Sequence, residues 1–366
     1  MTIKKYSLIV LFIFVSLFAF SNAEPHEGTH ENQSPEKFEP GKFIFNHIMD
    51  SHDWHLITIG ETHISLPLPV IVYSRKQGRL HVFMSSRFHH GHEAYNGLVM
   101  VDGKIFEADE AGLKDETAPV PLDFSITKNV LALFISVILL LILFISLARA
   151  YKKRPLKAPQ KIQSWLEPLI VFVRDDIARP AIGDKKYHRF MPFLLTVFFF
   201  IFLNNLIGLV PVLPGGANVT GNIAVTMILA LFTFAITTFS ANMAYWKHIV
   251  NAPGVPWWIK IPIPLMPVVE VVGMFTKPFV LMVRLFANIT AGHIIALGFF
   301  SLIFIFGEMS IYAGYGISII SVLFAIFMSV LELLVAFIQA YVFTLLSAIY
   351  FGLATEEHHH EHEPNH

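Results

Sequence analysis

The sequence contains no cysteine, which excludes disulfide bridges, thiol redox chemistry and cysteine-ligated metal sites. Charged residues are also scarce: they make up 14% of the chain, against about 25% in ordinary soluble proteins. The formal net charge is −1, so the chain lacks the basic footprint of a nucleic-acid-binding protein. Apolar residues dominate instead, at 54% of the chain with a mean hydropathy of +0.59. These figures predict an all-α polytopic membrane protein with some soluble mass attached.

Residues 1–23 have the pattern of a secretory signal peptide. A basic start at Lys4 and Lys5 precedes a short apolar run, and small residues close the segment at Ala23. The alternative is a first transmembrane helix, but the apolar run is short for one and polar sequence follows at once. We therefore expect cleavage after Ala23, which leaves residues 24–126 outside the cytoplasm.

Residues 24–126 are expected to form a small extracytoplasmic module with some β-structure. Its start, up to Lys42, is rich in Pro, Glu and His and is predicted to be disordered. Short apolar segments with Gly and Pro breaks predict strands; these are His55–Ile59, Ile64–Val72, Leu80–Met84 and Gly97–Val101. The module's ten histidines are either a metal site or scattered surface side chains. The second interpretation is favoured, because no compact ligand spacing repeats.

Residues 127–355 contain five long apolar segments, each able to form a membrane helix. About 20 helical residues, rising 1.5 Å each, match a hydrocarbon core near 30 Å thick. The segments are Asn129–Leu147, Phe190–Val212, Asn222–Trp246, Pro264–Phe306 and Ile311–Gly352. Trp165–Ala178 is apolar first and charged second, which is typical of a helix lying in the membrane interface.

Basic residues indicate the orientation of these segments. Six lysines and arginines follow the first segment, within residues 149–161, and Lys247 and Lys260 follow the third. Positive charge marks the cytoplasmic side, in agreement with the signal peptide. With five crossings, the charged tail at residues 356–366 also lies in the cytoplasm.

The last two segments have roughly 42 residues each, about twice the length that spans the hydrocarbon core. We expect them to tilt strongly or bend, as an antiparallel hairpin. A turn near Tyr312 places Arg284 level with Gln339. The same register places His293 level with Glu332. Arg284 and His293 are nine residues apart and lie on opposite sides of their helix, whereas Glu332 and Gln339 share a face.

Arg284 is an ionised residue in an apolar segment. A guanidinium keeps its proton in a protein, and at bilayer depth it costs about 2.5–3.5 kcal/mol. Glu270, Lys277 and Asn288 lie near the same stripe of the helix, by their spacing of seven and four. Such a stripe lines water or a protein partner rather than lipid. The alternative is an arginine that reaches the interface or ties two helices together.

The segment Arg284-Leu-Phe-Ala-Asn288-Ile-Thr-Ala-Gly292 closely resembles the signature of subunit a of F-type ATP synthases, the membrane stator beside the rotating ring of c subunits. Further matches are Leu166–Pro168, Phe172–Ile177, Asn204–Pro211, Asn222, Lys277–Pro278 and Ile338–Phe343. The resemblance implies a proton-channel subunit of the bacterial inner membrane, without catalytic chemistry, cofactor or metal of its own. Its implied partners are the c-ring, the peripheral stalk subunit b and, indirectly, the soluble head.

The resemblance implies that Arg284 faces the carboxylate of each passing c subunit, with Asn288 and Gln339 as its polar neighbours. A ring carboxylate must be neutral to cross lipid, whereas a fixed cation nearby favours its ionised form. Arg284 thus forces release of the ring proton at this point. It also blocks a proton wire through the membrane, because it cannot accept a proton. Whether the ion is a proton or sodium depends on the ring.

The remaining site residues are assigned to two half-channels by the same resemblance. Glu270 corresponds to the acidic residue on the cytoplasmic side. His293 and Glu332 correspond to an interacting pair on the outer side, with Asn222 as a polar lining residue. Some family members carry this acid and histidine in the reverse order, and Gly208 stands where some have an aspartate.

Other functional classes make different demands on the sequence. A secondary ion-coupled transporter with its own midplane site favours inverted repeats and broken helices in both halves, and no matching halves are visible. An intramembrane metalloprotease needs a ligand pair such as His-Glu-x-x-His, which the membrane part lacks. A sensor whose outer module binds a ligand is a third possibility.

Overall fold

The computed structural model describes residues 39–356 except 60–61, 92, 102, 154–157, 161, 211–215 and 251–264. The predicted signal peptide, residues 1–23, and the tail beyond Glu356 lie outside the described residues. The described chain divides into two compact units. The first comprises the residues up to Ser136, Leu206–Val219 and His293–Ser329, and the second comprises Val137–Asn205, Thr220–Gly292 and the residues from Val330 onward.

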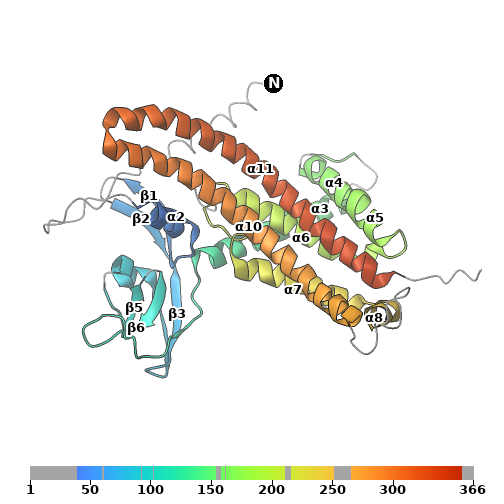
Figure 1. The fold of residues 1–366 in the computed structure, drawn as a ribbon, viewed down its shortest axis with the longest axis horizontal. Helices are drawn as coiled ribbons and strands as arrows, with labels where there is room; N and C mark the ends of the chain where they lie inside the picture. Colours follow the sequence, from blue (N-terminus) through green and yellow to red (C-terminus); the bar gives the residue numbers. More distant parts are fainter. Residues whose placement is uncertain are drawn as a thin grey trace, which may run out of the picture. The chain divides into compact units, whose positions relative to one another are not determined.

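The N-terminal part of the first unit is a small β-rich module, as the sequence predicts (Figure 1). Its elements are α2 (Pro40–Ile48), β1 (Asp53–Ile59), β2 (Thr62–Pro67), β3 (Pro69–Ser74), β4 (Arg79–Met84), the 3-10 helix η1 (Ser85–Gly91), β5 (Leu98–Val101), β6 (Lys104–Glu107) and β7 (Leu122–Asp123). All strand pairs are antiparallel: β1 pairs with β2, β3 lies between β4 and β7, and β5 pairs with β6. The buried core consists of Val70, Val72, Phe88, Leu98 and Ile105.

Two predictions for this module are wrong in detail. Ile64–Val72 is not a single strand, because β2 ends at Pro67, β3 begins at Pro69, and the two strands pair with different neighbours. Proline has no backbone N–H to donate to a neighbouring strand. Few hydrogen bonds between strands are therefore lost when the chain changes from one pairing strand to another at Pro67 and Pro69. The sequence also predicts disorder up to Lys42, yet α2 begins at Pro40, where proline suits the first turn of a helix.

A buried histidine holds the module together close to the start of the first membrane helix. The His52 ring lies 2.8 Å from a carboxylate oxygen of Asp123 and 3.1 Å from the carbonyl oxygen of Gly103. Burial is the largest single effect on His52 and opposes its charge, but the hydrogen bond and charge of Asp123, the Gly103 carbonyl and the Asp50 charge together raise the pKa of the imidazole. Burial is also the largest single effect on Asp123, yet the hydrogen bonds from His52 and Ser125 and the charge of His52 together lower the pKa of its carboxyl. Nearby, Asp50 accepts a 2.7 Å hydrogen bond from the Thr127 hydroxyl.

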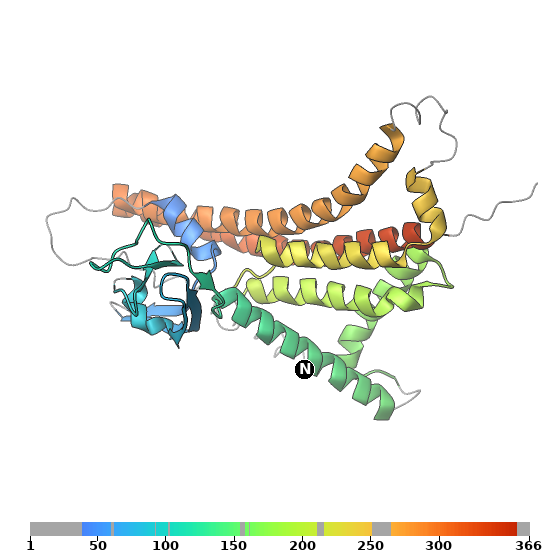
Figure 2. The same cartoon turned by 90° about the horizontal axis from the view of Figure 1, so that it is seen from below.

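Among the described residues, five helices are long and apolar enough to cross a membrane, as the sequence predicts. They are α3 (Lys128–Lys153), α6 (Tyr187–Gly208), α7 (Ile223–Ser240), α10 (Leu265–Met309) and α11 (Ile311–Thr355). In the second unit, α6, α7 and α11 lie side by side (Figure 2). The hydroxyls of Thr233 on α7 and Ser347 on α11 are 3.3 Å apart, and Phe190 of α6 stacks on Phe351 of α11.

Two predicted segments are divided into shorter helices. The predicted interfacial helix is α4 (Ile162–Phe172) followed by the π-helical turn η2 (Val173–Ala178), and α5 (Arg179–Ile182) continues from it. The predicted third crossing ends at Ser240, and α8 (Met243–Val250) is a separate helix. The break occurs where the Asn242 side chain accepts a 3.0 Å hydrogen bond from the backbone of Tyr245, which caps the new helix.

The final hairpin has the register predicted from the sequence. Helices α10 and α11 have 45 residues each, and Ser310 separates them. Within the second unit Gly292 packs against Glu332, and within the first unit the rings of Phe299 and Phe324 stack at 4.8 Å. Both pairs are equidistant, to within one residue, from the predicted turn centre. The N-terminal part of α10, which includes Pro278, curves away from α11 (Figure 2).

We predict that Gly352→Ala destabilises the second unit. A Cβ at this position of α11 would collide with the carbonyl oxygen of Ala181 in α5, and backbone atoms cannot rotate away as a side chain can. Overpacking of this kind costs about 1–3 kcal/mol. Thermal unfolding of the detergent-solubilised protein should show a lower midpoint. Gly273→Ala in α10 is the control, because no atom lies within 4 Å of its added carbon; equal midpoints for the two variants would contradict this packing.

Candidate functional site

Arg284 lies on an exposed face of α10. Asn288, one turn further along, is exposed on the same side of the helix, and Val280 and Val283 are exposed beside them. Leu281 and Leu285 are buried in the core of the second unit. Apart from Asn288, the side chains named around the guanidinium are apolar, and this surface is available to a partner rather than used for packing within this unit.

Two polar residues of α11, Glu332 and Gln339, lie on one face of the helix, with Ala336 between them. Glu332, Ala336 and Gln339 are four and three residues apart, which aligns them on one side of a helix. Gln339 is only 5% exposed, and Glu332 is half-buried with its Oε1 atom shielded from solvent. A polar face thus runs along α11 inside the second unit.

Gly292 makes room for the Glu332 carboxylate. A Cβ on residue 292 would lie 2.9 Å from Glu332 Oε1 and 3.4 Å from its Cγ, which is closer than side-chain packing normally allows. A small residue at this position of α10 lets the two helices approach closely. The Glu332 carboxylate is thereby held against Gly292. Gly292 is the residue that precedes His293 in the sequence.

Asn205 and Thr220 join this polar face, although the sequence analysis did not select them as site residues. The Asn205 amide donates to the carbonyl oxygen of Ala336 at 3.4 Å, between Glu332 and Gln339 on α11. The Thr220 hydroxyl donates to the Asn205 carbonyl at 2.5 Å. Both side chains are buried. The adjacent asparagines of an apolar helix were a usable signal for this network, since such residues rarely face lipid.

The other predicted residues have distinct surroundings. Asn222 caps α7: its side-chain oxygen accepts a 2.9 Å hydrogen bond from the backbone of Ala224. Glu270 is half-buried in the second turn of α10. The Lys277 ammonium lies 5.6 Å from the centre of the Tyr350 ring, a cation–π contact that links α10 to α11.

His293 is half-buried on α10, directly after Gly292. It belongs to the first unit, whereas Glu332 belongs to the second, so their pairing stays a prediction. No hydrogen bond is present between Arg284 and Asn288 or Gln339 within the part of the chain that the structure describes. Among the same residues, no three histidine, aspartate or glutamate side chains are grouped as a metal site would require.

Two families match the chain. Residues 130–352 match the family described as "ATP synthase A chain", and residues 43–124 match one described as "Domain of unknown function (DUF8433)". The chain is 43% identical to "ATP synthase subunit a" of Chloroherpeton thalassium over 282 residues, which cover 73% of this chain and 80% of that relative. It is 44% identical to the protein of the same name in Myxococcus xanthus over 252 residues, or 67% of this chain and 78% of the relative. A match over more than half of its length shows that this chain belongs to the ATP synthase A chain family, the subunit a of F-type ATP synthases.

Proposed function

We propose that this chain is the proton-translocating stator subunit of an F-type ATP synthase, and that Arg284 faces the carboxylate of each passing c subunit. The observation that carries this proposal is the exposed guanidinium on a largely apolar face of α10, where Asn288 is the polar neighbour. No carboxylate of the described residues pairs with it, and in lipid such a charge costs about 2.5–3.5 kcal/mol. A ring that presents carboxylates in turn supplies the missing counter-charge, which makes an exposed arginine favourable.

Two offset half-channels bring protons to and from this point. On the outer side, Glu332 and His293 relay protons, since both groups can take up and release them, and Asn222 lines the path. On the cytoplasmic side the acceptor is Glu270. Arg284 separates the two paths because it cannot accept a proton.

The buried network of Asn205 and Thr220 supports this assignment of the outer half-channel. Asn205 bonds to α11 at Ala336, between Glu332 and Gln339, and Thr220 bonds to Asn205, so polar groups continue beside the face that carries the carboxylate. Buried polar groups at membrane depth are costly unless they are satisfied or line water. The network therefore positions α11 and offers hydrogen bonds to water along the path.

The proposed partners are the c-ring and the peripheral stalk subunit b, and through them the soluble head. The proposed location is the bacterial inner membrane, with a cleaved signal peptide, residues 24–126 outside and the C-terminus in the cytoplasm. The basic residues in the last turn of α3, Lys152 and Lys153, support this orientation by the positive-inside rule.

Affinity purification of the tagged chain from mild detergent tests the proposal. A stator subunit should bring with it a ring of small hairpin proteins, a peripheral stalk and ATP hydrolysis activity. After reconstitution into vesicles, added ATP should drive proton uptake. A chain that purifies alone, and that moves a small solute with an ion after reconstitution, would instead be a secondary transporter.

A further inference from the structure

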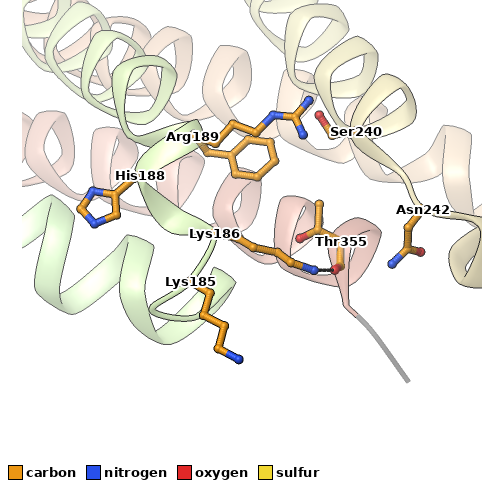
Figure 3. A pocket seen from close by; sticks show the side chains of 8 residues that line it. Lys185, Lys186, His188, Arg189, Ser240, Asn242 and Thr355 are labelled. Atoms are coloured by element: carbon orange, nitrogen blue, oxygen red, sulfur yellow. Dashed lines mark hydrogen bonds between the residues drawn. The ribbon is translucent and has the colours of Figure 1, made fainter. Parts of the chain in front are cut away.

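A cavity of about 500 Å³ lies where three membrane helices of the second unit end. α6 begins beside it at Tyr187, α7 ends at Ser240 and α11 ends at Thr355. The lining side chains are Lys185, Lys186, His188, Arg189, Phe190, Ser240, Asn242 and Thr355 (Figure 3). Because membrane helices end at the level of the lipid headgroups, this cavity opens at headgroup depth.

The cavity is rich in positive charge. Lys185 and Arg189 are exposed, and neither forms an ion pair with a carboxylate in the described part of the chain. The neighbouring acid, Asp184, lies 3.6 Å from Arg179 instead. The Lys186 ammonium donates a 2.7 Å hydrogen bond to the carbonyl oxygen of Thr355 (Figure 3), which directs it across the cavity to the end of α11. The charge therefore points to an anionic ligand.

Large exposed apolar side chains lie close in sequence to the lining residues at the same helix ends. Phe239 is 88% exposed and directly precedes Ser240, while Met243 is 70% exposed and directly follows Asn242. On α11, Leu353 is 47% exposed, two residues before Thr355. A cationic cavity with apolar side chains at the same helix ends suits a ligand that has both a charged and an apolar part.

We propose that this cavity binds the phosphate headgroup of an anionic phospholipid. Lys185, Lys186 and Arg189 attract the phosphate, since each cation close to an anionic lipid surface adds to binding. The Ser240 and Asn242 side chains provide hydrogen-bond donors. The acyl chains cover the apolar surface beside the cavity. A lipid bound here contacts the ends of α6, α7 and α11 together. Of these helices, α6 and α7 are the two that pack against α11.

The chain's own C-terminal segment is the alternative occupant. Residues 357–366 include three glutamates, and Asn242, which lines the cavity, donates a 2.7 Å hydrogen bond to the carbonyl oxygen of Glu356, the last described residue. The exposed apolar side chains favour the lipid, because an acidic and histidine-rich peptide would leave them uncovered.

Native mass spectrometry of the purified intact complex, titrated with phosphatidylglycerol or phosphatidylcholine, tests the proposal. The double variant Lys185→Gln with Arg189→Gln should bind phosphatidylglycerol about 30-fold more weakly, as expected for the loss of two cations near an anionic headgroup. The control is Lys152→Gln with Lys153→Gln, which removes the same charge from exposed positions outside the cavity. The control should bind like the unmodified complex, and both should prefer phosphatidylglycerol.

Three results would overturn the proposal. The first is equal phosphatidylglycerol binding by the cavity variant and the control. The second is complete displacement of the lipid by millimolar inorganic phosphate, which would make the cavity a site for free phosphate. The third is lipid binding that occurs only after deletion of residues 357–366, which would make that segment the natural occupant.

Discussion

ATP synthesis driven by a proton gradient should fall to background when Arg284 is replaced by alanine. The guanidinium is the exposed cation of an apolar face, and without it nothing at that face favours release of the proton from a ring carboxylate. The same change removes the barrier between the two half-channels, so passive proton conduction should rise. Inverted membrane vesicles permit both measurements, by ATP yield and by decay of an imposed pH gradient.

Two controls separate this effect from a failure of assembly. ATP hydrolysis by the head, measured after its release from the membrane, should be unchanged in Arg284→Ala. Val280→Ala trims the same exposed face one turn away without removing a charge, and it should keep most of the coupling. Normal gradient-driven synthesis by an assembled Arg284→Ala complex would exclude the proposed role of the arginine.

The membrane part of the fold could be predicted from the sequence because its signals are local and strong. Each crossing is a long apolar run, and the lengths of the last two runs exclude upright spans. The register of the hairpin followed from its turn alone, and the contact between Gly292 and Glu332 confirms it. Antiparallel helices joined by a tight turn leave little freedom in register, so one correct turn fixes many contacts.

The features that the sequence did not reveal depend on contacts between distant residues. The partners of β2 and β3 differ, and nothing in their shared apolar pattern indicates where one sheet ends. The bond from Asn205 to Ala336 joins residues far apart in the sequence. The π-helical turn at Val173–Ala178 likewise has no distinct local pattern, because the residues that favour an α-helix also occur there.

The predicted site residues stand out in the sequence, whereas their surroundings in the fold do not. Arg284, Glu332 and Gln339 are conspicuous because polar groups are rare in apolar segments. Their surroundings differ: the arginine is exposed, whereas the glutamine is buried. Exposure on one face and burial on another depend on which neighbours pack against each helix, and the periodicity of a uniformly apolar helix does not contain that information.

Gradient-driven ATP synthesis should also fall by about 100-fold in Glu332→Gln, the loss expected when a group that transfers protons is removed. Glutamine keeps the size of the side chain, so the contact with Gly292 is preserved while the ability to carry a proton is lost. Gly292→Ala is the steric counterpart. Its added carbon displaces the carboxylate without changing any titratable group, and it should reduce the rate less than Glu332→Gln does.

Exchanging the two groups, as His293→Glu with Glu332→His, tests whether they act together. If they relay protons as a pair, the double variant retains one acid and one imidazole and should recover more activity than either single change. Double variants of interacting residues depart from the sum of the single effects, whereas independent residues add. The measurement is ATP synthesis in vesicles, with assembly checked by head hydrolysis. A double variant no more active than the worse single variant would show that His293 and Glu332 function separately.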